Sequence, residues 1–307
     1  MSQTQELVVK QITLIGLGEV GTLLAQEFHA RWPEIRLTAY DWLYTRADMQ
    51  QRAQTLNVTL CENLAEALVD SQLIFSVVTA DSARSVAEQS AAWLQEGQYF
   101  LDLNSVSPLT KQKNSRSVIS ASAQYIDVAV MAPFPPARLG TPLLTGGPSA
   151  ELISHWLNEH GFNSSVHSKE IGEASAIKMC RSVMIKGLEA LTVECLSAAR
   201  MYGVEEEVLS SLHRSFPSLG WDKQLGDYLV SRVAEHGKRR AEEMAEVAKT
   251  LKDVGVTPSQ SLATRETQQR FVDELAARQL SWDQLQPFSW QKVIDQIYRT
   301  EASEPAK

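Results

Sequence analysis

The sequence predicts a doubly wound α/β domain with a parallel sheet, followed by an all-α domain and joined to it by one long helix. Three observations lead to this prediction. A glycine-rich turn follows the first apolar strand, short apolar strands then alternate with helical segments to about residue 166, and from residue 171 onward apolar residues recur at helical spacing. Alternating strands and helices are typical of a parallel sheet with helices on both faces.

The opening segment, residues 8–41, contains Gly16, Gly18 and Gly21 at G-x-G-x-x-G spacing between an apolar strand and a helical pattern. The first glycine permits a tight turn, the second lets backbone N–H groups approach a pyrophosphate, and the third lets the helix pack close to the sheet. The positive N-terminus of the helix then faces the phosphates. The segment therefore predicts a dinucleotide-binding unit of the Rossmann type.

A carboxylate, Asp41, follows the second strand of this unit, 25 residues after Gly16. At that distance it can accept both ribose hydroxyls of an adenosine, and it would repel a 2′-phosphate. No arginine directly follows it, and the nearest is Arg46. We expect NAD as the cofactor, with NADP as the open alternative. The expected cofactor-binding residues are Gly16, Leu17, Gly18, Glu19, Val20, Gly21, Asp41, Val78 and Thr79.

The remaining elements of the first domain are expected in alternation. Strands are predicted at residues 56–61, 73–78, 98–103 and 124–130, and helices at 63–69, 82–93, after Pro108 and at 150–160. The proline- and glycine-rich interval 132–147 is expected to be a connector. The predicted domains are 1–167, which binds NAD(P), and 168–307, which is all-helical.

The second domain begins with an expected helix over residues 171–201, which is long enough to leave one domain and enter another. Further helices are predicted at residues 224–236, 238–254, 257–277 and 290–300. Their apolar faces exceed what such a small bundle buries alone, so we expect a homodimer formed through this domain.

The composition disfavours a nucleic-acid-binding protein, a membrane protein and a metalloprotein. The chain has 307 residues, 44% of them hydrophobic, and a net charge of −8, which disfavours a general nucleic-acid partner. No apolar run reaches the roughly 18 residues of a membrane span, and the opening residues lack the features of a signal peptide, so a cytoplasmic protein is expected. The three cysteines are scattered and form no Cys/His cluster, which argues against a metal site.

Three further motifs lie downstream of the nucleotide unit: DLNSVSP at residues 102–108, GGP at 146–148 and GEASAIKMCRS at 172–182. With the glycine-rich turn, they resemble the β-hydroxyacid dehydrogenase family, the relatives of 6-phosphogluconate and 3-hydroxyisobutyrate dehydrogenases, over nearly the whole chain. Residues 236–244 resemble the C-terminal domain of a less characterised, 6-phosphogluconate dehydrogenase-like branch.

The resemblance implies an NAD(P)-dependent oxidoreductase that acts on CH–OH donors, with Lys178 and Ser182 as catalytic residues and Asn104 and Ser105 in contact with the substrate. A lysine near the nicotinamide can remove the hydroxyl proton during oxidation and return it during reduction. The expected substrate is a small anion, a hydroxy acid of the β-hydroxyacid type. A sugar-acid origin and a following decarboxylation stay open.

The chain departs from the family pattern at several motif positions, and these departures leave the reaction class standing but put the substrate in doubt. The differing residues are Asn104 for serine, Ser105 for threonine, Ala174 for glycine, Ser182 for asparagine and Glu243 for a lysine beside the cofactor.

Three basic or titratable residues, His236, Arg239 and Arg240, lie on the segment that in the family faces the cofactor. An arginine fork binds carboxylate or phosphate in bidentate geometry, so these residues are candidates for substrate binding. The equally weighted alternative is a solvated helix face, paired with the acids at 242, 243 and 246.

Two other functions compete with the dehydrogenase. One is an imine reductase-like enzyme, and the other is a non-catalytic nucleotide-binding interaction protein. Lys178 argues against both, because imine reductases of this fold generally lack lysine at that position and a sensor has no need of an acid–base group.

Overall fold

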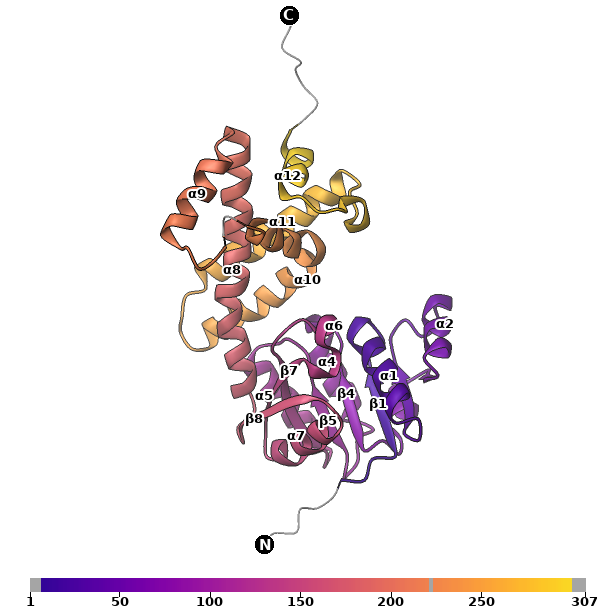
Figure 1. Ribbon diagram of the computed structural model, residues 1–307. Coiled ribbons are helices and arrows are strands. Elements are labelled where there is room, and N and C mark those ends of the chain that lie inside the picture. The colour runs from indigo at the N-terminus through magenta and orange to yellow at the C-terminus, as the bar shows by residue number, and fades with distance from the viewer. Residues whose placement is uncertain (1–6, 221–222, 300–307) are drawn as a thin grey trace, which may run out of the picture. The chain divides into compact units, whose positions relative to one another are not determined.

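The computed structural model describes residues 7–220 and 223–299. The chain divides into two compact units, Met1–Met179 and Cys180–Lys307 (Figure 1). Helix α8 (Glu173–Tyr202) continues from the first unit into the second, so the sequence-based boundary after residue 167 stays a prediction. Among the described residues, no helix is both long and apolar enough to cross a membrane.

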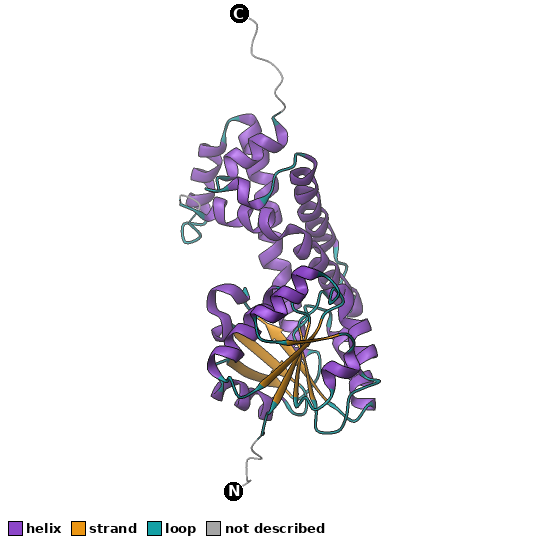
Figure 2. Cartoon of the chain, turned by 90° about the vertical axis from the view of Figure 1, so that its right-hand side faces the viewer, coloured by secondary structure: helices purple, strands orange, loops and turns teal. Residues whose placement is uncertain are grey.

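The first unit is built around a sheet. Its strands are β1 (Gln11–Ile15), β2 (Arg36–Tyr40), β3 (Thr59–Cys61), β4 (Leu73–Ser76), β5 (Tyr99–Asp102), β6 (Gln124–Val130), β7 (Pro142–Gly146) and β8 (Asn163–Ser168). Its other elements are α1 (Glu19–Arg31), α2 (Ala47–Thr55), α3 (Leu64–Leu68), α4 (Ala80–Ser90), α5 (Pro108–Ser120), α6 (Phe134–Ala137), the 3₁₀ turn η1 (Arg138–Gly140) and α7 (Ala150–Glu159). Helices lie on both faces of the sheet (Figure 2).

Within the described residues, the sheet has eight strands in the order β3-β2-β1-β4-β5-β6-β7-β8. Strands β1 to β6 run parallel to one another, and β7 is antiparallel to β6. The strand order reverses at β1, which pairs with β2 on one side and β4 on the other. Doubly wound folds bind their ligands at the carboxyl ends of the strands at such a reversal. The predicted α/β class is confirmed.

The expected connector at residues 132–147 was wrong, because this interval contains α6, η1 and β7. The prolines and glycines of this interval favour a loop in a sequence-based prediction. In the structure, β7 begins at Pro142, and its Leu143 and Thr145 are buried. Proline is tolerated at the start of a strand. Strand β8 was also missed, because its sequence NSSVHS is mostly exposed at the edge of the sheet and carries little apolar signal.

Both faces of the central strands are apolar, as expected of a covered parallel sheet. On one face, Leu14 joins a buried cluster with Phe28 and Phe75, whose rings meet edge-on at a centroid distance of 5.5 Å. On the other face, Ile15 belongs to a cluster with Phe100. This apolar packing on both faces holds the strands in the sheet. Polar side chains lie near the ends of the strands.

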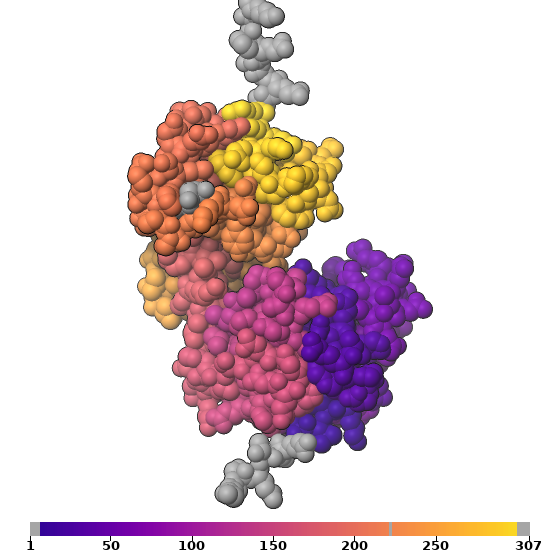
Figure 3. All heavy atoms as spheres, in the orientation of Figure 1, coloured from indigo at the N-terminus to yellow at the C-terminus, as the bar shows by residue number. Residues whose placement is uncertain are grey.

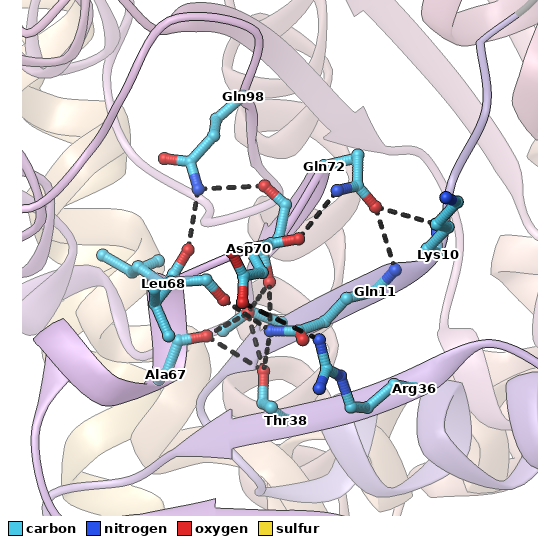
Figure 4. Close-up of polar contacts among 12 residues, drawn as sticks. Lys10, Gln11, Arg36, Thr38, Ala67, Leu68, Asp70, Gln72 and Gln98 are labelled. Atoms are coloured by element: carbon cyan, nitrogen blue, oxygen red, sulfur yellow. Dashed lines mark hydrogen bonds and ion pairs between the residues drawn. The ribbon is translucent and has the colours of Figure 1, made fainter.

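Buried polar side chains near the amino ends of the strands hydrogen-bond with one another (Figure 4). Thr13 Oγ1 lies 2.8 Å from Thr38 Oγ1, and Gln11 Nε2 donates to Ser71 Oγ at 3.1 Å. Gln98 Nε2 donates to the carbonyl oxygens of Leu68 and Ser71. Because these groups satisfy one another, they tie the segment after α3 to β1, β2 and the start of β5.

The second unit is helical, as predicted. Beyond α8 it contains α9 (Glu205–Ser215), α10 (Leu225–Asp253), α11 (Ser259–Ala277), the 3₁₀ turn η2 (Trp282–Leu285) and α12 (Trp290–Tyr298). Its core includes Leu196 of α8, Val233 of α10, Phe271 of α11 and Ile294 of α12. Helix α9, which lies within the described residues, has no buried residue. Figure 3 shows this orange segment on the surface.

Two helices were predicted at residues 224–236 and 238–254, and this was wrong, because α10 is continuous across residue 237. The sequence-based prediction ended one helix before Gly237 and began the next after it. A Cβ atom there would lie 2.7 Å from Val272 Cγ1 and 2.9 Å from the Gln268 carbonyl oxygen, so the glycine lets α10 and α11 approach closely. The final residue of the predicted helix 290–300 lies outside the described residues.

Candidate functional site

The glycine-rich turn lies between β1 and α1, at the point where the strand order reverses. Gly16 has φ +98°, and a Cβ atom there would lie 2.8 Å from the Val77 carbonyl oxygen. A Cβ atom on Gly21 would lie 2.1 Å from the carbonyl oxygen of Gly16, which is far inside van der Waals contact. These two glycines are therefore required by the packing of the turn against β4 and α1.

Gly18 differs from the other two glycines because its Cβ position meets no heavy atom within 4 Å in the described structure. It is exposed and forms the N-cap of α1, whose first N–H groups lack partners within the helix. Open space at a helix N-terminus suits an anionic phosphate. The turn thus fits the pyrophosphate of a nicotinamide dinucleotide.

The carboxylate of Asp41 is held at the end of β2 by two backbone amides. Leu17 N donates to Asp41 Oδ2 at 2.9 Å, and Leu43 N donates to Asp41 Oδ1 at 3.0 Å. Arg46 forms an exposed ion pair with Asp48 at 2.9 Å. The structure therefore places Asp41 against the glycine-rich turn, and its role in cofactor binding stays a prediction.

The other expected cofactor-binding residues surround the same turn. Leu17 is buried, Glu19 is exposed and Val20 is half-buried at the start of α1. Val78 Cγ1 lies 3.2 Å from the Cβ position of Gly16, and Thr79 is the N-cap of α4. All of these residues lie at the carboxyl ends of β1 and β4.

The structure joins the predicted catalytic lysine to a predicted substrate-binding residue. Lys178 Nζ, on α8, donates to Ser105 Oγ at 2.6 Å. Ser105 follows β5, and both residues are half-buried. An amine and a hydroxyl in contact at a strand end give a site where a proton can be transferred to or from a bound hydroxyl group.

Asn104 precedes Ser105 and is 4% exposed. Only one of its two side-chain polar atoms has a hydrogen-bond partner among the described residues. Asn104 Nδ2 donates to Ser76 Oγ at 2.9 Å, while Asn104 Oδ1 is buried without a hydrogen-bond partner among the described residues. Ser182 is buried one helical turn beyond Lys178 on α8. Sequence reasoning placed both residues in the site, and their roles stay predictions.

Sequence reasoning missed a buried charged cluster beneath Asn104 and Ser105. Asp102, Lys111 and Asp127 have fully buried side chains, and Lys111 Nζ lies 3.1 Å from Asp102 Oδ1 and 3.4 Å from Asp127 Oδ1. Asn114 Nδ2 and Tyr125 Oη also donate to Asp102 Oδ2, at 3.1 and 2.7 Å. Burial and the nearby Asp102 and Asp127 raise the pKa of Tyr125 well above its usual value, so the phenol stays protonated.

A signal for this cluster is present in the sequence. Asp127 interrupts an otherwise apolar strand, YIDVAV, and charged residues are almost never fully buried unless they are paired. The partner was not identifiable from spacing alone, because Asp102 and Asp127 become neighbours only through the parallel register of β5 and β6.

The three candidate substrate-binding residues of the second unit lie on α10 among carboxylates. Arg240 Nη1 donates to Glu189 Oε2 at 2.6 Å, and both side chains are at most 10% exposed. Arg239 Nη1 lies 2.9 Å from Glu243 Oε1 on the solvent side. Glu243 also pairs with the buried Lys186. The acidic partner expected for a solvated helix face is therefore present for Arg239, whereas Arg240 is buried.

His236, the third candidate for substrate binding on α10, lies near three arginines. Burial, followed by the nearby Arg232, Arg239 and Arg240, lowers the pKa of His236 to about 4. The imidazole is therefore neutral at pH 7 and offers a hydrogen bond but no positive charge. Within the same cluster, burial lowers the pKa of Lys186, against the attraction of Glu243.

No metal centre accompanies these sites in residues 7–220 and 223–299, where no three His, Cys, Asp or Glu side chains are placed to hold an ion.

Comparisons with known proteins cover both units. Residues 11–158 match the family model for the NAD binding domain of 6-phosphogluconate dehydrogenase, and residues 199–271 match a domain of unknown function, DUF1932.

Three solved structures extend this similarity. A conserved hypothetical protein from Sinorhizobium meliloti 1021 is 32% identical, with a TM-score of 0.73, over 95% of this chain and 98% of that one. A conserved protein of unknown function, described as structurally similar to 3-hydroxyacid dehydrogenases, is 28% identical, with a TM-score of 0.66, over 85% of this chain and 97% of that one. The 3-hydroxyisobutyrate dehydrogenase of Mycobacterium tuberculosis shares the fold at 14% identity, with a TM-score of 0.71, over 95% of this chain and 100% of that one. The chain therefore belongs to the β-hydroxyacid dehydrogenase family, in a branch that joins the NAD binding domain of 6-phosphogluconate dehydrogenase to a DUF1932 domain.

Proposed function

We propose that this protein is an NAD-dependent oxidoreductase that interconverts a small hydroxy acid and its keto or semialdehyde form. The observation that carries the proposal is the contact of 2.6 Å between Lys178 Nζ and Ser105 Oγ. Ser105 follows the carboxyl end of β5, in the same parallel sheet whose β1–α1 turn carries the open Gly18 position. An acid–base group and a nucleotide-binding turn thus share one edge of the sheet.

In the proposed reaction, Lys178 Nζ accepts the proton of the substrate hydroxyl during oxidation and returns it during reduction. Ser105 Oγ, which accepts a hydrogen bond from Lys178 Nζ, orients the amine toward that hydroxyl. The bound nicotinamide supplies the hydride chemistry. The Ser105 hydroxyl is the proposed donor to the substrate carboxylate, while Asn104, which is 4% exposed and donates to Ser76 Oγ, supports the adjoining loop.

The proposed function is tested by following the ultraviolet absorbance of reduced nicotinamide with the full-length protein, NAD and a panel of small hydroxy acids. We expect turnover with acids that carry the hydroxyl on the β carbon, and little with acids that carry it on the α carbon. Oxidation of reduced nicotinamide with imines but not with keto acids would instead identify an imine reductase. Tight NAD binding without turnover of any panel member would favour a nucleotide-sensing protein.

We also propose that NAD is preferred over NADP because of Asp41. Both of its carboxylate oxygens are held by backbone amides, and Arg46 is engaged with Asp48, so a 2′-phosphate would meet a fixed negative charge. In titrations, the wild type should bind NAD at least about tenfold more tightly than NADP. Asp41→Asn should bring the two affinities within about threefold, because a charged hydrogen bond contributes roughly 1.5 to 3 kcal/mol.

Asp70→Asn is the matched control for this change. Asp70 is exposed at the amino edge of the sheet, where it lies 3.9 Å from Arg36. It should leave both affinities unchanged. A wild type that binds NADP more tightly would show that another cation neutralises Asp41, with Arg52, which donates to the Leu17 carbonyl oxygen at 3.0 Å, as the first residue to examine.

The expected homodimer is retained as a proposal for the second unit. It is supported by large exposed apolar side chains on α8, among them Met184, Leu191 and Tyr202, which are 74%, 60% and 84% exposed. Apolar exposure of this extent is typical of an interaction surface.

A further inference from the structure

The strongest unexplained feature of the first unit is its buried Asp102–Lys111–Asp127 cluster. The two aspartates are register partners on neighbouring parallel strands, and all three side chains are fully buried. Burying charge is costly, and a well-packed apolar cluster is often equally stable. Each of the two carboxylates holds a different backbone segment in place.

Asp127 holds the first turn of α8. Asp127 Oδ2 accepts from the backbone N–H groups of Gly172 and Ser175, each at 3.1 Å, and Asp127 Oδ1 accepts from Ser175 Oγ at 2.5 Å. The residue before the helix is Gly172, which has no side chain to cap it. A carboxylate from β6 therefore performs the capping that a local side chain performs at α3 and α5, where Asn63 and Ser107 accept from the helix backbone.

Asp102 holds the loop that carries Ser105. Asp102 Oδ1 accepts from Asn104 N at 2.9 Å, and Lys111 Nζ also donates to the Asp102 carbonyl oxygen. Lys111 thus links Asp102, which holds the loop that carries Ser105, to Asp127, which holds the helix that carries Lys178. Lys178 follows Ser175 by three residues, which is less than one helical turn.

We infer that Asp127, linked to Asp102 through Lys111, is a positioning residue that sets Lys178 Nζ against Ser105 Oγ. The inference rests on the proposed acid–base role of Lys178. A displacement of about 1 Å at a reacting group can cost about a hundredfold in rate. Because Asp127 contacts neither the glycine-rich turn nor Asp41, its effect should fall on the chemical step and spare cofactor binding.

The test is Asp127→Asn in the full-length protein. This change keeps the shape of the side chain and removes the charge that caps α8. We expect kcat to fall about tenfold to a hundredfold, while the Kd for NAD changes less than about twofold and KM changes less than kcat. Amide hydrogen exchange should accelerate at residues 172–178 and stay unchanged in β1 and β4.

Two further variants separate positioning from general destabilisation. Ser175→Ala, which removes one of the bonds to Asp127, should change kcat and exchange in the same direction but less, and it serves if Asp127→Asn fails to fold. Ser71→Ala removes a buried hydroxyl at the amino edge of the same sheet. It should lower the free energy of unfolding without lowering kcat.

The inference is overturned if Asp127→Asn retains kcat within about twofold, or if Ser71→Ala lowers kcat as much as Asp127→Asn does. If the wild type turns over no hydroxy acid, the proposed function fails on that result alone. Amide hydrogen exchange then tests independently whether Asp127 caps α8, because this measurement needs no substrate. Unchanged exchange at residues 172–178 in Asp127→Asn would refute the capping role.

Discussion

Replacing Lys178 by methionine is expected to lower kcat about 10² to 10⁴-fold and to leave the Kd for NAD within about twofold. General acid–base groups typically contribute a rate factor of this size. Methionine keeps the length and apolar stem of the side chain but cannot accept or donate the reacting proton. The amine lies against Ser105, which follows β5, and the glycine-rich turn follows β1, so cofactor binding should not depend on it.

The matched control is Lys169→Met, which removes an exposed lysine of the same unit that lies 3.7 Å from Glu151. It should retain wild-type kcat and KM. The two variants are compared by steady-state kinetics on the hydroxy acid that the wild type turns over, with NAD titrations alongside. If Lys178→Met keeps kcat within a few-fold of the wild type, Lys178 is not the acid–base group and the proposed mechanism is wrong.

Replacing Arg240 by methionine should lower the free energy of unfolding of the second unit by about 3 to 5 kcal/mol. Breaking a buried ion pair from one side leaves the other charge, here that of Glu189, without its hydrogen-bonded cation. Arg240 and Glu189 are 10% and 2% exposed at their side chains, so water cannot readily replace the lost partner. Urea unfolding followed by helical circular dichroism measures the change.

Arg239→Met is the control on the next residue of the same helix. Its side chain is 55% exposed, and an exposed i,i+4 pair contributes only about 0.3 to 0.5 kcal/mol. The double variant Arg240→Met with Glu189→Leu should recover most of the lost stability, because it removes both buried charges. If Arg240→Met instead keeps its stability and raises KM more than tenfold, Arg240 binds the substrate, which is one of the two alternatives that the sequence left open.

The nucleotide-binding half of the site was predictable because its signals are local. Gly16, Gly18, Gly21 and Asp41 lie within one strand–helix–strand segment, where spacing determines geometry. Lys178 and Ser105 were identified by resemblance, and their contact depends on where β5 and α8 meet in the fold. No spacing rule reports that contact.

The remaining features depend on tertiary partners. Gly237 has the sequence signature of a helix break, yet its role is set by Val272 and Gln268 on another helix. Arg240 looks like its neighbour Arg239 in the sequence, but burial against Glu189 separates them. Edge strands such as β8 are also weakly encoded, because hydrogen bonds to one neighbour hold them with few apolar side chains.

The three glycines of the first turn are needed for different reasons. Gly16 and Gly21 have no room for a methyl group, so a chain selected for folding alone must keep both. Gly18 has open space around its Cβ position, and nothing in the described structure forbids alanine there. The fold therefore does not require glycine at position 18, whereas the proposed close approach of a pyrophosphate to the turn favours it. A descendant that stopped binding nucleotide would be free to lose this glycine first while its fold stayed intact.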